Sequence, residues 1–393
     1  MSSIPPAGEG PEPIPFGRPM LGSAEADAIQ RVLAGPTLVH GPASHEFESR
    51  FAARAGAKHG ICVSSCTAGL HLSLLASGIG PGDTVAVPAM THVATAHAVE
   101  FCGARPLFVD VEADTGNMDP DALAAAVEPS LKAVEVVHYL GLPCDMDRIS
   151  AVAADTGAVV IEDCALALDA EYGGRTAGTL GLTGCFSFYP IKHMTTIEGG
   201  MVTTDDEGLA QAIARRKAFG YDRPLGARAG PGIYDVTELG YNYRMNEVQA
   251  AVGLSQLDRL DQFQRARAEN HRVLKSCLDE IDEVVVFPTT KGKAISSHYC
   301  LNAILPRDGS IERDAVVAEL KALGVGTSVH YPSAVPLFTY YRNKYGYREG
   351  QFPVAEWLAA QTISLPVGPH LGAGDAARIA AAVKAAITIA RSR

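Results

Sequence analysis

The stretch Val159-Val160-Ile161-Glu162-Asp163 is a run of three apolar residues that ends in two acids. A short run of β-branched residues predicts a buried strand, which we expect at residues 158–163. Similar runs, rich in valine and isoleucine, alternate with helical patterns from about residue 57 to 220. This alternation is typical of strands joined by crossover helices, so it predicts an α/β fold with a mostly parallel sheet. The other strands are expected at residues 60–64, 84–88, 106–111, 133–138, 185–189 and 201–204.

The length of 393 residues is sufficient for one large and one smaller domain. We expect a flexible, proline-rich N-terminal arm at residues 1–15, a large α/β domain at 16–250 and a smaller α+β domain at 251–393. A long helix is predicted from residue 245 to about 263. In the second domain we expect strands at 284–287, 298–305 and 327–331, and helices at 313–323 and 373–390.

Charge and composition argue against several classes of protein. A net charge of -11 at pH 7 does not suit a protein that neutralises nucleic-acid phosphates. No run of about 18 apolar residues occurs, and the N-terminus has no secretory signal pattern. The eight cysteines form no C-x-x-C pair, so we expect reduced, buried thiols. These observations predict a cytoplasmic protein that binds a small molecule, with no membrane contact and no metal site.

Two segments of the predicted sheet suit a phosphorylated, nitrogen-containing ring. Residues 64–69, Ser-Ser-Cys-Thr-Ala-Gly, follow a strand and open a helical run. The N–H groups at a helix start can bind phosphate, although such turns are as often simple helix starts. Asp163 ends a strand, where α/β sheets bind ligands, and its carboxylate could pair with a protonated pyridine nitrogen. An isolated acid at this position is more often a helix cap.

A lysine in the segment 185–200 provides a third anchor. Lys192 lies between the aromatic residues of Phe186-Ser187-Phe188-Tyr189 and the turn Gly199-Gly200. Desolvation in such a setting lowers the pKa of an amine and leaves it nucleophilic, so it can form a Schiff base. An arbitrary lysine is far more often a solvated surface residue. A phosphate seat, a pyridinium partner and a Schiff-base amine are together what one pyridoxal 5′-phosphate (PLP) molecule requires.

The chain resembles the sugar aminotransferases of the DegT/StrS type, a branch of the PLP enzymes with the aspartate-aminotransferase fold, fold type I. The resemblance extends from about Ile14 to Leu371. It rests on eight ordered motifs, at residues 64–68, 80–83, 109–111, 162–163, 186–188, 192 with 198–200, 240–245 and 328–331.

The resemblance implies a role for each cofactor-facing residue. Lys192 would hold PLP as a Schiff base and, once released, move the proton between substrate and cofactor. Asp163 would pair with the pyridine nitrogen, and His92 would stack on the ring. Without the resemblance, His92 would as readily be a packed or solvated histidine.

The resemblance also implies how the phosphate is held. The backbone at Cys66 and Thr67 and the hydroxyl of Ser187 would contact it, together with Asn242 from a second subunit. A homodimer with two shared sites is therefore expected.

The expected substrates are a nucleotide-linked keto-sugar and an amino-acid donor, L-glutamate. His330 and Tyr331 would face the sugar, and Arg244 is a weaker candidate for the same region. In the first half of the reaction the donor would convert PLP to pyridoxamine 5′-phosphate. The second half would aminate the ketone of a deoxysugar at carbon 4, with carbon 3 as the alternative.

Other classes of protein were weighed against this one. A PLP-dependent keto-sugar dehydratase of similar fold has histidine in place of the lysine, so Lys192 argues against it. A non-catalytic PLP-binding regulatory protein is favoured only by Leu166, which stands where the family commonly has His or Gln. A nicotinamide-dependent dehydrogenase would need the glycine fingerprint that the first strand-turn-helix lacks.

Overall fold

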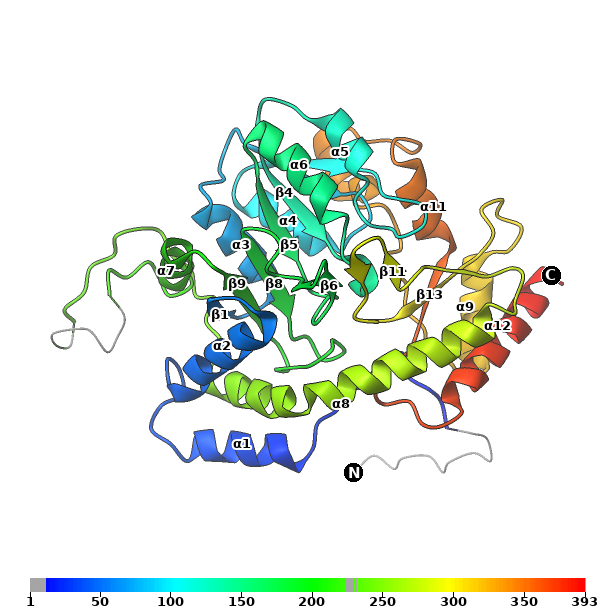
Figure 1. The fold of residues 1–393 in the computed structure, drawn as a ribbon, viewed down its shortest axis with the longest axis horizontal. Coiled ribbons are helices and arrows are strands. Elements are labelled where there is room, and N and C mark those ends of the chain that lie inside the picture. Colours follow the sequence, from blue (N-terminus) through cyan, green and yellow to red (C-terminus); the bar gives the residue numbers. More distant parts are fainter. Residues whose placement is uncertain (1–11, 224–229, 231, 393) are drawn as a thin grey trace.

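A seven-stranded sheet forms the centre of the larger part of the molecule (Figure 1). The computed structural model describes residues 12–223, 230 and 232–392. Four neighbouring strand pairs are parallel, and one strand, β9, is antiparallel to both of its neighbours. The predicted α/β fold with a mostly parallel sheet is therefore confirmed. In spatial order the strands are β1 (His59–Val63), β9 (Gly200–Thr204), β8 (Thr183–Ser187), β5 (Val159–Asp163), β4 (Leu131–Val137), β2 (Thr84–Pro88) and β3 (Arg105–Val109).

Helices cover both faces of this sheet because alternate residues of a strand point to opposite sides. On β4, Ala133 belongs to the core cluster that includes helices α3 and α4. Val134 and Val136 belong instead to the cluster that includes α5 and α6. The helices around the sheet are α3 (Cys66–Ala76), α4 (Val93–Phe101), α5 (Pro120–Ala126), α6 (Met146–Thr156) and α7 (Glu207–Arg216).

A second core lies near the C-terminus, where a small antiparallel sheet packs against two helices. This α+β arrangement agrees with the fold class predicted for the C-terminal part. The elements are β10 (Val285–Val286), β13 (Leu301–Ile304), β14 (Thr362–Leu365), α9 (Arg313–Ala322) and α12 (Asp375–Arg391). A further four-stranded sheet joins β11 (Thr290–Lys291) and β12 (Ala294–Ile295) to β6 (Glu171–Tyr172) and β7 (Arg175–Thr176).

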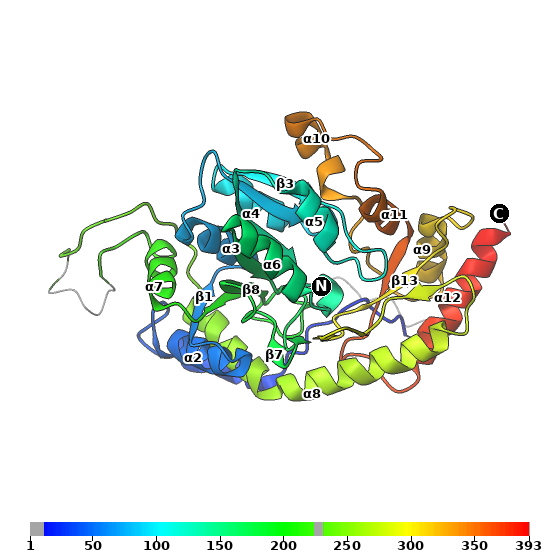
Figure 2. The same cartoon turned by 45° about the horizontal axis from the view of Figure 1, so that its top comes forward.

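One long helix, α8 (Glu247–Leu278), connects the two cores (Figures 1 and 2). Near its start it packs against α1 (Ser23–Leu33) and α2 (Pro42–Ala55), and it also packs against α12. The helix therefore ends 15 residues beyond the predicted end near residue 263. Its second half carries charged residues that hide the apolar pattern, yet Leu274 and Leu278 are fully buried in the second core.

The boundary expected between residues 250 and 251 falls inside this continuous helix. Beyond α8 the chain also returns to the large sheet, since Val335, Tyr341 and Leu358 belong to the same core cluster as α3 and α4. These residues come from the short segment 335–337, from α10 (Thr339–Tyr345) and from α11 (Pro353–Gln361).

The strand expected at residues 327–331 is wrong. Ser328 makes one isolated bridge with Ser364, through backbone hydrogen bonds of 3.0 and 2.8 Å. The pairing stops there because His330 has other partners. Its backbone oxygen accepts a hydrogen bond from the Tyr139 hydroxyl, and its ring nitrogen Nδ1 lies 2.8 Å from the Ser364 hydroxyl.

The predicted N-terminal arm lies partly outside the described residues, which begin at Glu12. Ile14 is buried and pairs with Val325, with backbone hydrogen bonds to Gly324 and Gly326. The chain is thus a fixed part of the second core before residue 16. Among the described residues, none of the helices combines the length and the apolar character needed to cross a membrane.

Replacing Leu358 by Ala tests whether α11 belongs to the core of the large sheet. Leu358 is fully buried, so the cavity should lower the free energy of unfolding by about 2–5 kcal/mol. Leu323→Ala is the control, because Leu323 is 42% exposed and its loss should cost no more than about 0.5 kcal/mol. Urea denaturation of both variants measures the difference, and equal costs would contradict the assignment.

Candidate active site

Asp163 ends β5 at the carboxyl edge of the sheet, and its carboxylate is held by three neighbours. The Thr95 hydroxyl of α4 donates to Oδ2 at 3.1 Å, and the Ala165 N–H donates to Oδ1 at 3.0 Å. The Cys66 thiol lies 3.8 Å from Oδ1. The side chain is 5% exposed, so its direction is fixed by these contacts. A carboxylate held in this way can pair with a cationic ring nitrogen.

The start of α3 lies beside Asp163 and has the features of an anion seat. The Ser65 hydroxyl caps the helix by accepting the Ala68 N–H at 3.1 Å, which leaves the neighbouring N–H groups of Cys66 and Thr67 at the positive end of the helix. Ser187 of β8 pairs with Gly200 of β9. A Cβ added to Gly200 would lie 2.6 Å from the Cys66 nitrogen, so this strand touches the helix start.

Lys192 follows β8 and is partly buried. Its Nζ atom lies 5.0 Å from the centre of the Tyr299 ring. Burial lowers the pKa of the Lys192 amine, and the Asp163 carboxylate acts in the opposite direction. The two groups are thus close enough to interact. A lysine with a lowered pKa has more of the neutral amine that forms a Schiff base.

Two histidines and a tyrosine surround the same space. The ring of Tyr331 lies 5.9 Å from that of His92 and 5.3 Å from that of His330. Burial lowers the pKa of His330 to about 3, with Lys192 and His92 adding to the effect. Burial also lowers the pKa of His92, although Asp163 opposes it. Both rings are therefore neutral at pH 7 and can stack or accept a hydrogen bond.

Asn242 and Arg244 contact each other, and neither contacts Asp163 or Lys192 within this chain. The Arg244 guanidinium donates to Asn242 Oδ1 at 2.9 Å and lies 4.8 Å from the Phe219 ring centre. The intervening Tyr243 accepts the Ser64 N–H at 2.7 Å through its carbonyl, so the segment runs beside the strand that leads to α3. Asn242 itself is exposed.

Thr95, Tyr139 and Tyr299 belong to the site but were not predicted. Tyr139 follows the carboxyl end of β4, so the rule that selected Asp163 could have found it. Asn302 donates to its hydroxyl at 3.1 Å, and the hydroxyl donates to His330. Tyr299 comes from a distant segment that leads into β13, and no local pattern marks it.

Glu162, next to Asp163, has a structural role. Its carboxylate accepts N–H groups of Gly178, Leu180 and Gly181 at 2.7, 2.7 and 2.6 Å. His138 Nε2 lies 2.9 Å away, and its Nδ1 accepts the Cys144 N–H, so Nε2 is the donor to Glu162. Glu162 thus fixes the loop after β7, and only Asp163 faces the site.

Leu166 lies three residues after Asp163, just beyond the end of β5, and is 2% exposed. Its side chain is part of the core and cannot donate a hydrogen bond, but its carbonyl accepts the Ser297 hydroxyl at 3.2 Å. Any polar contact to a ring on this side must therefore come from another residue.

A buried acid at a strand end, a helix start and a partly buried lysine thus meet at one edge of a mostly parallel sheet. The three fit the groups of PLP, since the donor-lined cradle between α3 and Gly200 suits a phosphate and the Lys192 amine suits an aldehyde. This arrangement defines the class of fold type I PLP enzymes.

Comparison with known proteins identifies the branch of that class. The model of the DegT/DnrJ/EryC1/StrS aminotransferase family matches residues 19–384. The spore coat polysaccharide biosynthesis protein SpsC of Bacillus subtilis is 38% identical over 375 residues, which cover 94% of this chain and 96% of SpsC. The chain belongs to the DegT/DnrJ/EryC1/StrS aminotransferase family.

Solved structures agree. The putative sugar aminotransferase Spr1654 from Streptococcus pneumoniae, in its PMP form, has a TM-score of 0.91 at 28% identity and covers 96% of this chain and 100% of its own. DesI has a TM-score of 0.88 at 34% identity, covering 98% of this chain and 95% of its own. The protein is therefore a PLP-dependent aminotransferase.

Gly200→Ala should disturb the contact between β9 and the start of α3. The added methyl would lie 2.5 Å from the Ser65 carbonyl carbon, so the helix start must move. We expect the Kd for PLP to rise at least about tenfold, a loss of about 1.4 kcal/mol. Gly80→Ala is the control because nothing lies within 4 Å of its added Cβ. Titration of the apoenzyme with PLP measures the Kd of both variants. An unchanged Kd in Gly200→Ala would contradict phosphate binding at the start of α3.

The pH dependence of PLP capture tests the pair of Lys192 and Asp163. Only the neutral amine attacks, so capture slows as pH falls through the Lys192 pKa, which lies below its ordinary value of 10.5. Asp163→Asn removes a charge that raises this pKa, so the midpoint should move to lower pH. Asp169→Asn is the control, since Asp169 pairs with Arg54 at 2.7 Å. Stopped-flow absorbance from pH 6 to 10 measures the midpoints, and a shift to higher pH would contradict the pairing.

Proposed function

We propose that the enzyme transfers the amino group of L-glutamate to the ketone at carbon 4 of a nucleotide-linked keto-deoxysugar. The observation that carries the amino-transfer chemistry is the environment of Lys192. Burial lowers the pKa of its amine, and Asp163 lies close enough for its charge to raise that pKa. The sugar substrate is supported by the relatives. DesI was crystallised in the presence of its TDP-sugar product, and SpsC is named for polysaccharide biosynthesis.

When bound, PLP supplies an electron sink, and the protein supplies position and proton transfer. In this proposal Asp163 binds the ring nitrogen, while the Cys66 and Thr67 N–H groups and the Ser187 hydroxyl bind the phosphate. His92 stacks on the ring. The contacts of Asp163 with Thr95 and Ala165 support its part, because they hold the carboxylate in one orientation.

Lys192 moves the proton in both halves of the reaction. Its amine takes a proton from the substrate carbon that carries the donor's amino group and delivers it to the cofactor carbon, then reverses the transfer for the sugar. The lowered pKa of Lys192 supports this role, since an amine must be neutral to accept a proton. His330 and Tyr331 contact the sugar, and their burial keeps both side chains uncharged.

The proposed enzyme is a homodimer in which Asn242 reaches the phosphate of the neighbouring subunit. Asn242 is exposed in the single chain, and apolar side chains nearby in the sequence are exposed as well. Leu239 is 79% exposed and Val236 is 54% exposed, which is typical of a surface that a second copy covers. Arg244 lies beside Asn242 and would contact the sugar from the same side of the interface.

The absorption spectrum of the protein with PLP, before and after L-glutamate, tests the proposal. We expect a visible band that depends on Lys192 and that glutamate converts to the pyridoxamine 5′-phosphate spectrum. Lys192→Ala is the control and should lack that band. Lys217→Ala is the matched lysine variant, because Lys217 pairs with Glu48 at 2.9 Å outside the site.

The second half of the reaction is tested by adding keto-sugar nucleotides to the glutamate-treated enzyme. A substrate with a 4-ketone should restore the visible band, and the aminated sugar is then identified by mass spectrometry and NMR. Restoration by a 3-keto isomer alone would contradict the choice of carbon 4. If only sugars without a nucleotide restored it, the nucleotide-linked substrate would be wrong.

A further inference from the structure

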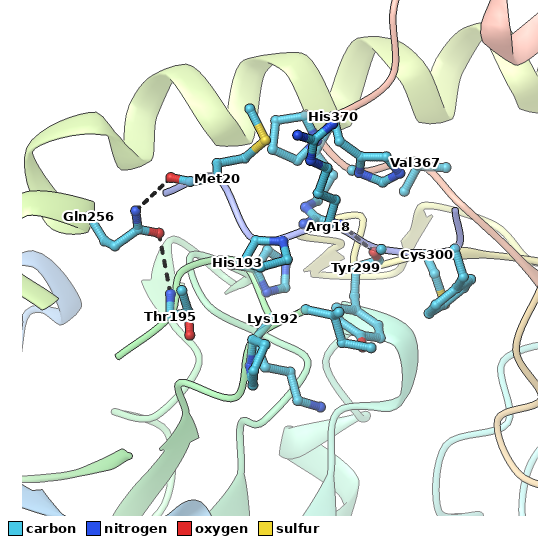
Figure 3. A pocket seen from close by; sticks show the side chains of 18 residues that line it. Arg18, Met20, Lys192, His193, Thr195, Gln256, Tyr299, Cys300, Val367 and His370 are labelled. Carbon is cyan, nitrogen blue, oxygen red and sulfur yellow. Dashed lines mark hydrogen bonds between the residues drawn. The ribbon is translucent and has the colours of Figure 1, made fainter. Parts of the chain in front are cut away.

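A cavity lies behind Lys192, where five parts of the chain that are distant in sequence meet, one of them residues 299–300 (Figure 3). Residues 16–20 of the N-terminal segment form one wall, the loop 190–195 a second, and α8 with residues 367–370 the others. Five of the side chains that line it are basic or can be: Arg18, Lys192, His193, Arg267 and His370. None of the lining residues is an acid.

Arg267 of α8 is a buried cation without an anion. Its side chain belongs to a residue that is 4% exposed, and Nη1 donates to the Tyr299 carbonyl. Its Nε has no hydrogen-bond partner, and in the part of the chain that the structure describes no carboxylate forms an ion pair with it. Arg259 lies two turns earlier on the same helix and pairs with Glu25. Among the described residues, Arg267 thus differs from Arg259 in having no carboxylate partner.

This arrangement is costly unless something compensates the charge. Burial lowers the pKa of Arg267 to about 10, so the guanidinium remains charged at pH 7. A buried ion that lacks a counter-ion costs several kcal/mol. A planar guanidinium with free donors binds carboxylate or phosphate oxygens well.

Arg18 adds a second positive charge to the cavity, whereas burial lowers the pKa of His193 and His370 and leaves both rings neutral at pH 7. The pKa of His370 is lowered by burial and further by Arg267 and Arg18, so these three groups lie close together. Figure 3 draws Arg18 beside His370. The acid that acts on His370, Asp375, accepts the Gly372 N–H at 2.8 Å and lies 3.8 Å from Arg378. It does not line the cavity.

The cavity adjoins the cofactor seat at Lys192, which lines it. In Figure 3 the amine of Lys192 extends away from Arg18 and His370. Neither Asp163 nor the start of α3 lines the cavity. An anion bound here would therefore contact the loop that carries Lys192 from behind, without taking part in the reaction.

We propose that this cavity is a binding site for a compact oxyanion, a carboxylate or a phosphate, held by Arg267 together with Arg18. The anion links the N-terminal segment and α8. It supplies the negative charge that Arg267 lacks and so stabilises the folded holoenzyme. The site is independent of which sugar the enzyme aminates.

The experiment uses the PLP-loaded enzyme, whose own phosphate seat is filled. Thermal unfolding is followed while inorganic phosphate, or in a second series acetate, replaces chloride at constant ionic strength. Saturable binding should raise Tm by about 2 °C for each tenfold rise in anion concentration above Kd. The series in which this rise begins at the lower concentration identifies the oxyanion that binds more tightly.

Arg267→Met removes the buried charge and should abolish this rise. Without the oxyanion its Tm should equal or exceed that of the wild type, whereas the loss of a purely structural arginine would lower it. Arg18→Met leaves the buried Arg267 unchanged and should weaken binding of the oxyanion several-fold. The test therefore does not depend on one variant. Arg307→Met is the control, because Arg307 is exposed and lies over Trp357. The same rise in all four proteins, or no rise in the wild type, would overturn the proposal.

Discussion

Three backbone N–H groups and the ring of His138 donate hydrogen bonds to one buried carboxylate, that of Glu162. Glu162 lies in the central strand β5, directly before Asp163, and neither side chain is free to rotate. The same carboxylate fixes residues 178–181, which lead into β8 and so toward Lys192. The acid and the lysine of the site are thus aligned by a residue that faces away from it. A buried charge is tolerable here because four donors satisfy it.

The reactivity of Lys192 depends on two opposing effects of its position. Burial favours the neutral amine, and the Asp163 carboxylate favours the charged form. Tyr299, whose ring lies next to the amine, comes just before β13 of the second sheet, but its side chain packs in the core of the large sheet. Lys192 therefore has its intended environment only when the segment that leads into β13 is packed against the large sheet.

The sequence predicted those features that depend on local patterns. Most strands of the large sheet contain a short apolar run, and Asp163, Lys192 and the helix start at Cys66 are marked by their place at or after the end of a strand. Residues brought in from far along the chain had no such mark. Tyr299 and Arg267 look like ordinary polar or aromatic residues of a strand and a helix, and only packing buries them.

The same limit explains the errors. Residues 327–331 have the composition of a strand, but His330 uses its hydrogen-bonding groups on Tyr139 and Ser364. The end of α8 was placed too early because charged residues interrupt its apolar face at the crossing between the two cores. The role of Asn242 in a second subunit stays a prediction, because the residue is exposed in the single chain.

The continuity of α8 restricts how the molecule can move. A helix of 32 residues is about 48 Å long and has no break where it passes from one core to the other. The two cores therefore cannot swing about a flexible joint at this crossing. If the second core closes over a substrate, its side chains must slide against α8, which stays straight. Such shear movements are small. A substrate must then be enclosed by the side chains of the site and by loops, more than by the approach of one core to the other.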